Sequence, residues 1–206
     1  MQVNEQLRFN GVFDRFPRFV APPVPSFHGP IDPVFFAIRP DEDAARRIMR
    51  QAERVKAEYG LAGRATPGER LHVTLQWVPV PRGAVEWFAA IARFVALDIG
   101  IPPFDVTFDD VLSFRKKEGS RPIALRGGAG ELMGLFQILG EGLRRLGFGE
   151  FARRAFTPHV TMLYDRREVP AHAVEPITWP VREFVLIHSL QGQGRHKVVG
   201  RWPLHG

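Results

Sequence analysis

Two stretches of the sequence, LHVTLQW at residues 71–77 and PHVTMLY at residues 158–164, each contain His-Val-Thr followed by an apolar residue. With only seven histidines in 206 residues, fewer than one His-x-Ser/Thr triplet is expected by chance. The two triplets also share a central valine, and their histidines, His72 and His159, lie 87 residues apart. This repetition predicts that the motif occupies the same structural setting twice in one fold.

The elements predicted around the two motifs recur in the same order. Before the first motif, the apolar run PVFFAIR (33–39) predicts a buried strand, and acidic residues at 41–43 begin a helix that ends at Gly60. Before the second motif, RPIALR (121–126) predicts a strand and residues 130–148 predict a leucine-rich helix. Each motif then lies in a strand of its own. The two leading strands start 88 residues apart, which indicates an internal duplication of a strand–helix–strand unit.

The remaining segments complete the predicted domain. They are a helix over 84–97, one or two strands within 103–114, and a closing hairpin made of 180–190 and 197–204. Residues 17–33 contain six prolines, a composition that excludes a helix or a central strand. We therefore expect an N-terminal arm and proline-rich linker over residues 1–30, followed by a single bilobal domain over residues 31–206.

The predicted fold class is α+β. Two pseudo-symmetric lobes, each with a mainly antiparallel sheet and outer helices, are expected to face each other across a central cleft. A pseudo-two-fold axis would present the same strand face of both copies to that cleft, so the paired His-Val-Thr motifs are expected to meet there.

The composition narrows the classes of function. The chain has no cysteine, which excludes disulfides, thiolate zinc sites and a cysteine nucleophile. Its formal net charge of +6 favours acidic partners such as RNA or nucleotides. It has no apolar run of the roughly 18 residues that a membrane span needs, and no secretory signal pattern. We expect a cytoplasmic monomer that binds no membrane and uses no metal or cofactor.

The residue types of the motifs point to chemistry at phosphorus. Side chains alternate along a strand, so His72, Thr74 and Gln76 are predicted on one face, and His159 and Thr161 share a face of the second strand. One imidazole can accept a proton from the attacking group while the other donates one to the leaving group. The two hydroxyls can hydrogen-bond the non-bridging oxygens. Gln76 is expected either to touch substrate or to form a passive wall.

The paired motifs in this setting resemble those of the 2H phosphoesterase superfamily. The similarity is to its bacterial and archaeal 2′-5′ RNA ligase-like branch, also called RNA 2′,3′-cyclic phosphodiesterases. It runs from about Pro33 to Leu204 and includes FFAIRP, HVTLQWV, AFTPHVTM and FVLIHSLQ. The resemblance implies a hydrolase of RNA processing that opens a 2′,3′-cyclic phosphate to a 2′-phosphomonoester. It also implies reversible 2′-5′ joining as a side activity.

The resemblance assigns roles to individual residues. It implies His72 as the general acid toward the 3′ oxygen and His159 as the base that activates water, with Thr74 and Thr161 on the phosphate. It places an aromatic residue five positions after the first histidine, where Trp77 is expected to stack on a base.

At the corresponding place after the second histidine the family has an arginine, whereas this chain has Tyr164. That departure leaves the natural substrate open, and neither Arg166 nor Arg167 is expected to replace the arginine.

Two alternatives to this function stay open at the level of sequence. One is a phosphodiesterase for another small cyclic phosphate, such as one on ADP-ribose. The other is a catalytically idle module that binds RNA or nucleotides. The basic run RKK (115–117) and the glycine-rich RGGAGE (126–131) are interpreted as ordinary loops, and no chemistry is assigned to the five other histidines.

Overall fold

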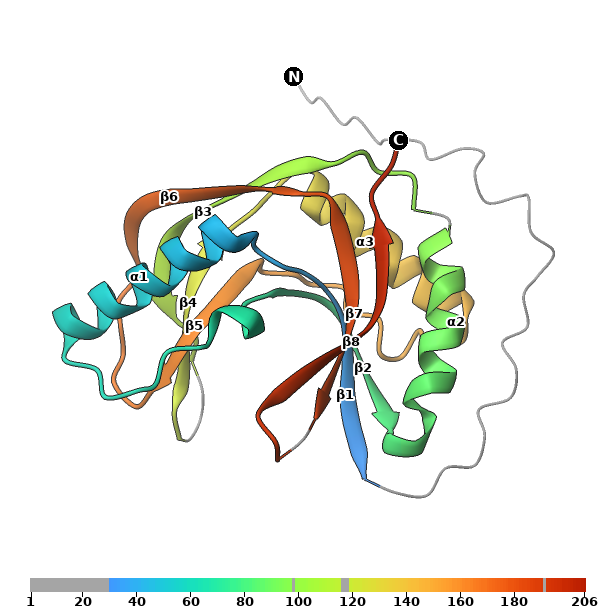
Figure 1. Cartoon of the computed structure of the whole chain (residues 1–206), viewed down its shortest axis with the longest axis horizontal. Helices are drawn as coiled ribbons and strands as arrows, with labels where there is room; N and C mark the ends of the chain where they lie inside the picture. Colours follow the sequence, from blue (N-terminus) through green and yellow to red (C-terminus); the bar gives the residue numbers. More distant parts are fainter. Residues whose placement is uncertain (1–29, 98, 116–118, 191) are drawn as a thin grey trace.

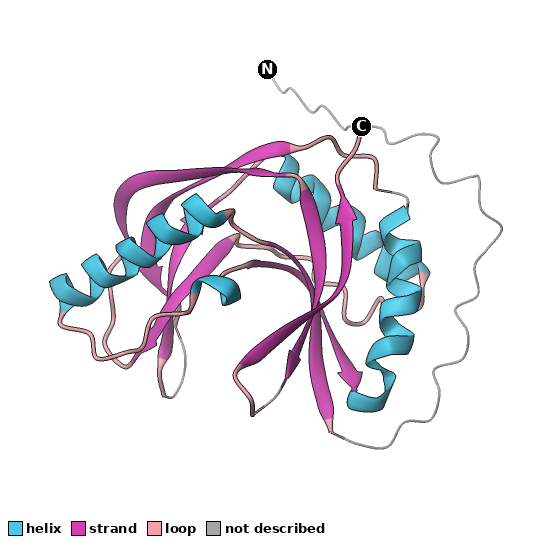
Figure 2. Ribbon diagram, viewed as in Figure 1, coloured by secondary structure: helices cyan, strands magenta, loops and turns pink. Residues whose placement is uncertain are grey.

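An eight-stranded antiparallel sheet forms the centre of the protein, with the strand order β6-β3-β4-β5-β2-β1-β7-β8. The structure is a computed structural model that describes residues 30–97, 99–115, 119–190 and 192–206. The arm and linker predicted over residues 1–30 therefore lie almost wholly outside the described residues. The strands and the three α-helices within these described residues give an α+β fold, as the sequence predicted (Figure 2).

The element bounds follow the predicted order closely. The strands are β1 Ile31–Ile38, β2 Val73–Pro81, β3 Phe104–Ser113, β4 Arg121–Gly127, β5 His159–Asp165, β6 His172–Val181, β7 Glu183–Leu190 and β8 Arg195–Pro203. The α-helices are α1 Glu42–Tyr59, α2 Val85–Leu97 and α3 Glu131–Arg145, and the short 3₁₀ helices are η2 Gly68–Arg70 and η3 Arg82–Ala84.

Strand β6 is the element that the sequence did not reveal. It contains Pro176 and Pro180, which argue against a central strand. The sheet resolves this conflict because β6 is an edge strand that pairs with β3 on one side. A proline lacks an N–H, and at an edge that missing donor can face solvent without breaking a ladder hydrogen bond.

Local signals fix the ends of α1 as predicted. The side chain of Asp41 accepts a hydrogen bond from the backbone N–H of Ala44 at 2.8 Å, and acidic residues fill the first turn. Gly60 ends the helix in the left-handed conformation with φ 60°, where a side chain would be strained.

The helices pack against the sheet in two groups, α1 alone and α2 with α3. Helix α1 contacts β5 and β6, whereas α2 and α3 contact each other and β2 (Figure 1). Large side chains buried between these layers include Phe36, Phe88, Phe108 and Trp179. The central strands β2 and β5 have one face packed on this core.

The register of the central strands repeats with a constant offset. Ala37 pairs with Thr74 between β1 and β2, and Ala124 pairs with Thr161 between β4 and β5. Each member of the second pair lies 87 residues after its counterpart, which is also the spacing of the histidines. The strand order is symmetric in the same way, because β4 lies next to β5 and β1 lies next to β2 on either side of the central pair.

A β-bulge follows the threonine of each motif. In β2 the pairing with β1 skips Leu75, and in β5 the pairing with β4 skips Met162. An extra residue in one strand shifts the alternation of side chains beyond it to the other face. The two bulges therefore change which residues downstream of each motif share the face of the histidine.

Candidate active site

The two predicted motifs meet at the centre of the sheet. Val73 of β2 pairs with Val160 of β5, and both valine side chains are fully buried. The histidine before and the threonine after each valine point to the opposite face, where all four are half-buried. Because the strands are antiparallel, the histidine of each motif lies beside the threonine of the other. We call these four residues the twin-motif site: His72, Thr74, His159 and Thr161.

The loop before the first motif is anchored on the strand of the second. The N–H of Thr66 donates to the carbonyl of Met162 at 2.7 Å, and the N–H of Gly63 donates to the Asp165 carboxylate at 2.7 Å. Asp165 also accepts from the N–H of Arg167, and these backbone hydrogen bonds hold its pKa below the usual value. The approach of the chain to His72 is thereby tied to β5.

The two imidazoles are oriented in the same way. Nδ1 of His72 lies 2.7 Å from the carbonyl oxygen of Arg70, and Nδ1 of His159 lies 2.7 Å from the carbonyl oxygen of Thr157. A carbonyl oxygen only accepts, so Nδ1 carries the hydrogen in both rings. Nε2 of each neutral ring is then left with a lone pair, as a general base requires.

The surroundings of His72 disfavour its charged form. Its ring stacks on Phe35 with centroids 4.8 Å apart and meets the ring of His196 edge-on at 5.3 Å. Desolvation by burial lowers the pKa of His72, and the positive charges of His159, Arg70 and Arg39 lower it further. Burial also lowers the pKa of His196, to about 4, with smaller effects from His72 and the same two arginines.

His159 has a simpler environment. Its ring packs on Phe114 with centroids 4.5 Å apart. Burial lowers the pKa of His159, and the Arg153 guanidinium adds a smaller effect in the same direction. The pKa of each histidine of the twin-motif site is therefore lowered from the ordinary value of the residue.

Trp77 and Tyr164 occupy matching positions beyond the two bulges. Each lies three residues after the threonine of its motif, and their side chains are 39% and 53% exposed. Beyond the bulges, both aromatic side chains lie on the exposed face of their strands, whereas the residues next to them in sequence are buried. The rings of Trp77 on β2 and Tyr164 on β5 are therefore both accessible to a ligand.

Gln76 does not share the face of His72 and Thr74, and this part of the prediction is wrong. The bulge at Leu75 turns Gln76 into the core, where it is completely buried. Its amide donates to the carbonyl of Phe136 at 3.0 Å and accepts from the N–H of Arg153 at 2.9 Å. The side chain therefore joins α3 to the loop that leads into His159.

The side-chain amide of Gln76 occupies space next to Gly140 of α3, which has no side chain. A Cβ at Gly140 would lie 2.8 Å from Nε2 of Gln76, so α3 approaches β2 closely only with glycine there. Strict alternation along the strand could not reveal this role, because the bulge depends on pairing with β1.

Other predicted features take structural roles. Arg167 donates to the carbonyl of Tyr59 at 3.2 Å, at the end of α1. That it does not replace the family arginine stays a prediction. Of the basic run 115–117, only Arg115 lies within the described residues. Of the glycine-rich segment 126–131, only residues 128–130 form a loop, because Arg126 and Gly127 end β4 and Glu131 begins α3. Arg126 forms an ion pair with Asp110 at 2.6 Å.

His188 belongs to a buried polar cluster away from the motifs. Its Nε2 lies 2.8 Å from Asp32, which is 1% exposed, and Arg82 donates two hydrogen bonds to the same carboxylate. The Arg82 guanidinium, with His188, holds the pKa of Asp32 below its usual value against the opposing effect of burial. The cluster joins β1, β7 and η3.

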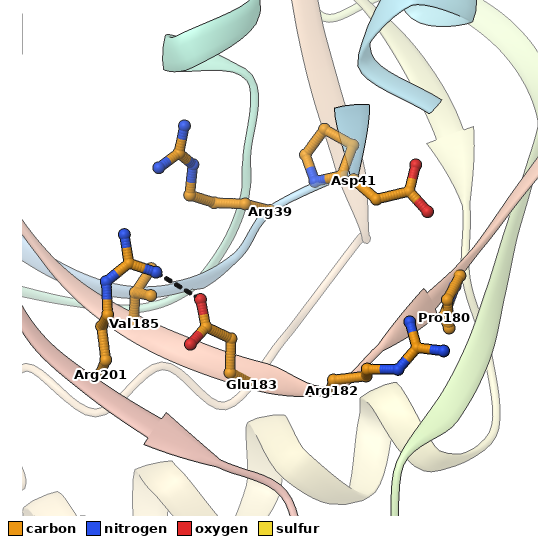
Figure 3. A pocket seen from close by; sticks show the side chains of 8 residues that line it. Arg39, Asp41, Pro180, Arg182, Glu183, Val185 and Arg201 are labelled. Atoms are coloured by element: carbon orange, nitrogen blue, oxygen red, sulfur yellow. Dashed lines mark hydrogen bonds and ion pairs between the residues drawn. The ribbon is translucent and has the colours of Figure 1, made fainter. Parts of the chain in front are cut away.

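A cavity of about 330 Å³ opens where β1 ends. Arg39 from the end of β1, Arg182 between β6 and β7, and Arg201 from β8 line it, and Arg201 is paired with Glu183 (Figure 3). None of the four twin-motif residues is among its lining residues. The cavity is therefore separate from the histidines, although Arg39 borders it and also acts on the pKa of His72.

None of the helices in the described part of the chain has the length and apolar character of a membrane span. Within the same residues, no three or more His, Asp or Glu side chains gather in a way that would hold a metal ion.

Solved structures share this fold. TT0787 of Thermus thermophilus is 22% identical, with a TM-score of 0.68 over 84% of this chain and 98% of that one. LigT of E. coli complexed with 3′-AMP is 24% identical, with a TM-score of 0.62 over 86% of this chain and all of that one. LigT complexed with ATP is 25% identical, with a TM-score of 0.62 over 85% and 99%.

Sequence comparison is consistent with these structures. No curated protein sequence gives a significant match. The model of the 2′-5′ RNA ligase superfamily matches residues 40–193, about three quarters of the chain and both histidine motifs. The chain therefore belongs to the 2′-5′ RNA ligase superfamily of LigT-like 2H phosphoesterases, as its paired motifs predicted.

Proposed function

We propose that this protein is a metal-independent phosphodiesterase that opens the 2′,3′-cyclic phosphate of an RNA end or a small nucleotide. The observation that carries the proposal is the Val73–Val160 pairing, which brings two equally oriented imidazoles to one face of the sheet. A displacement at phosphorus needs a base and an acid on opposite sides of the phosphate, and two such imidazoles meet that need.

The proposed reaction assigns one proton transfer to each histidine. Nε2 of His159 accepts a proton from water as the water oxygen attacks phosphorus. The bond between phosphorus and the 3′ oxygen breaks, and Nε2 of His72 donates a proton to that oxygen. The product is a 2′-phosphomonoester with a free 3′ hydroxyl. The same ring opening with a 5′ hydroxyl in place of water as the nucleophile gives a 2′-5′ linkage and a free 3′ hydroxyl, and attack of that 3′ hydroxyl on the linkage reverses it; this is the proposed side activity.

The hydroxyls of Thr74 and Thr161 complete the proposed site. Each lies beside the histidine of the other motif and is half-buried, so it can donate to a non-bridging phosphate oxygen. Donors fixed on strands keep the phosphate in line with the two imidazoles without reorganisation during the reaction. Both strands are held by long-range pairing on each side, which favours such a fixed geometry.

We also infer that the domain is a duplicated, bilobal fold with the reaction centre between its halves. The constant offset of 87 residues in strand register and the matching bulges support this interpretation. Each half then contributes one histidine, one threonine and one exposed aromatic ring. Trp77 is the proposed stacking partner of a base, since its ring is accessible.

The substrate class is proposed as an adenosine-type nucleotide or an RNA end, in a cytoplasmic RNA-processing role. E. coli LigT has been solved with 3′-AMP, ATP and NADP+, which are all adenosine phosphates. The net charge of +6 suits either ligand. A cyclic phosphate on ADP-ribose is the alternative substrate, and an idle nucleotide-binding module is the alternative without catalysis.

A substrate panel in excess EDTA tests the proposal. It contains a 2′,3′-cyclic mononucleotide, an RNA oligonucleotide ending in a 2′,3′-cyclic phosphate, ADP-ribose cyclic phosphate and a 3′,5′-cyclic mononucleotide. We expect turnover of the first two with a 2′-phosphomonoester product, identified by ³¹P NMR, and none of the 3′,5′-cyclic compound. The matched control is the double variant His72→Ala/His159→Ala, and turnover equal to wild type in that control would refute the assignment.

A further inference from the structure

Three basic side chains gather on the His72 side of the twin-motif site. Arg70 accepts the hydrogen bond of His72 through its carbonyl, and its positive charge helps to lower the pKa of His72. Nη2 of Arg39 donates to the carbonyl of Glu69 at 2.9 Å, which brings this guanidinium to the same loop. His196 of β8 meets the ring of His72 at 5.3 Å. We call Arg39, Arg70 and His196 the basic cluster.

The β7–β8 hairpin closes the cluster from the other side. The rings of His196 and Phe35 have centroids 5.6 Å apart, so His196 packs against a side chain of β1. A Cβ at Gly194, in the turn before His196, would lie 3.8 Å from Nη1 of Arg70. Residues from three separate segments, 35–39, 69–72 and 194–196, therefore surround one small region next to His72.

The basic cluster has unused hydrogen-bonding capacity. Over the described residues, neither Arg39 nor Arg70 forms an ion pair with a carboxylate. Nε of Arg70 and Nδ1 of His196 are buried, and neither finds a hydrogen-bond partner within that part of the chain. Buried polar groups are normally paired, and unpaired positive charge attracts an anion.

The equivalent places near His159 differ. The position 87 residues after Arg39 is Arg126, whose charge is balanced by Asp110 at 2.6 Å. The position 87 residues after Arg70 is Thr157, which is uncharged. At these two matching positions, therefore, the His159 side has no unbalanced charge, and the cation that acts on the pKa of His159 is Arg153, from a different position.

We propose that the basic cluster is an anion subsite that binds a second phosphate of the substrate, separate from the phosphate at the twin-motif site. The inference rests on the proposed function, because the twin-motif site must hold the first phosphate. The reacting phosphate lies between the two histidines and contacts both motifs. Of these two histidines, the basic cluster contacts only His72, so its ligand is a different phosphate. The ligand class is a nucleotide with two separated phosphates, as at the 3′ end of an RNA.

Calorimetric titration with two product-like ligands tests this subsite. The probes are adenosine 2′-monophosphate and adenosine 2′,5′-bisphosphate, and the measured quantity is the ratio of their affinities. We expect wild type to prefer the bisphosphate. Arg70→Gln and Arg39→Gln should each reduce that preference by about tenfold or more, because a charge-assisted hydrogen bond is lost.

Two further variants control for charge and for folding. Arg93→Gln removes an exposed charge from α2, where Arg93 bonds only the carbonyl of Ala90 among described partners, and it should leave the ratio unchanged. Arg70→Lys keeps the charge but removes the buried Nε–H, so it should retain part of the preference. Circular dichroism and thermal melting of each variant identify any that does not fold.

Three results would overturn the proposal. One is an equal loss of affinity for both ligands in Arg70→Gln and Arg39→Gln, since the cluster would then act on the reacting phosphate. The others are an unchanged ratio in both variants, or a wild type without preference. The titrations involve no turnover, so an enzyme that fails to hydrolyse the substrate panel still gives a result here.

Discussion

Val73 and Val160 pair directly across the middle of the sheet, and this contact brings the two histidine motifs of the chain together. Both valines are buried, so their neighbours face away from the core. The pairing joins segments 87 residues apart and makes one site from two halves.

Removal of either imidazole should abolish most of the activity. We expect His72→Ala or His159→Ala to lower turnover of a 2′,3′-cyclic nucleotide by about 10²–10⁴-fold, the usual effect of losing a positioned acid or base. The double variant should lose less than the product of the two single losses, because both groups act in one transition state. Steady-state kinetics of the three variants measures this, and near-normal turnover in either single variant would exclude the mechanism.

The threonines should affect binding of the transition state rather than proton transfer. Thr74→Val and Thr161→Val keep the shape of the side chain but remove the hydroxyl donor, so each should reduce kcat/KM by about 10–10³-fold. The apparent pKa values of the pH–rate profile should change little, because the histidines set them. If those values moved as far as in the histidine variants, the hydroxyls would have a different role.

The pH optimum of kcat/KM should lie on the acid side of pH 6.5. Burial lowers the pKa of both His72 and His159 from the ordinary value near 6.5. Below both values the two rings are protonated and no base remains, and above both values the two rings are neutral and no acid remains. Because kcat/KM reports the free enzyme, its bell-shaped profile should peak between the two lowered values. Rates measured from pH 4 to pH 9 decide this, and a maximum above pH 7 would contradict it.

Gln76 should matter for stability and for the placement of His159. Gln76→Leu keeps the volume but leaves the carbonyl of Phe136 and the N–H of Arg153 without their partner, which should cost about 2–4 kcal/mol of unfolding free energy. Urea denaturation measures the loss. The exposed Gln137 on α3, changed to Leu in the same way, is the matched control and should shift the unfolding free energy by less than about 0.5 kcal/mol.

Tyr164 should set how strongly the protein binds RNA. Tyr164→Arg adds a positive charge on an exposed position of the motif strand, so it should strengthen binding of an RNA that ends in a cyclic phosphate. The salt dependence should steepen by about one unit of slope for each added phosphate contact. Binding of a mononucleotide should change less. Titrations of both ligands at several salt concentrations test this, and equal slopes with unchanged RNA affinity would show that Tyr164 does not contact substrate.

Much of this protein was predictable because its signals are local or repeated. Apart from β6, the order of strands and α-helices followed from periodicity. Asp41 and Gly60 fixed the ends of α1 through capping rules that involve only neighbouring residues. The two His-Val-Thr motifs identified the candidate catalytic residues, since repetition at constant spacing is visible in one sequence. The family followed from the same motifs.

Only the tertiary structure decided the features that depend on distant pairing. The bulge opposite β1 sent Gln76 into the core and turned Trp77 outward, a change that strict alternation cannot foresee. The edge position of β6 accommodates its two prolines, which would interrupt a central strand. The meeting of His196 with His72 depends on how β8 folds back from a hairpin more than 120 residues away. A sequence records which residues are present and their local preferences, whereas contacts between remote strands arise from burying one shared core, and that core exists only in the folded chain.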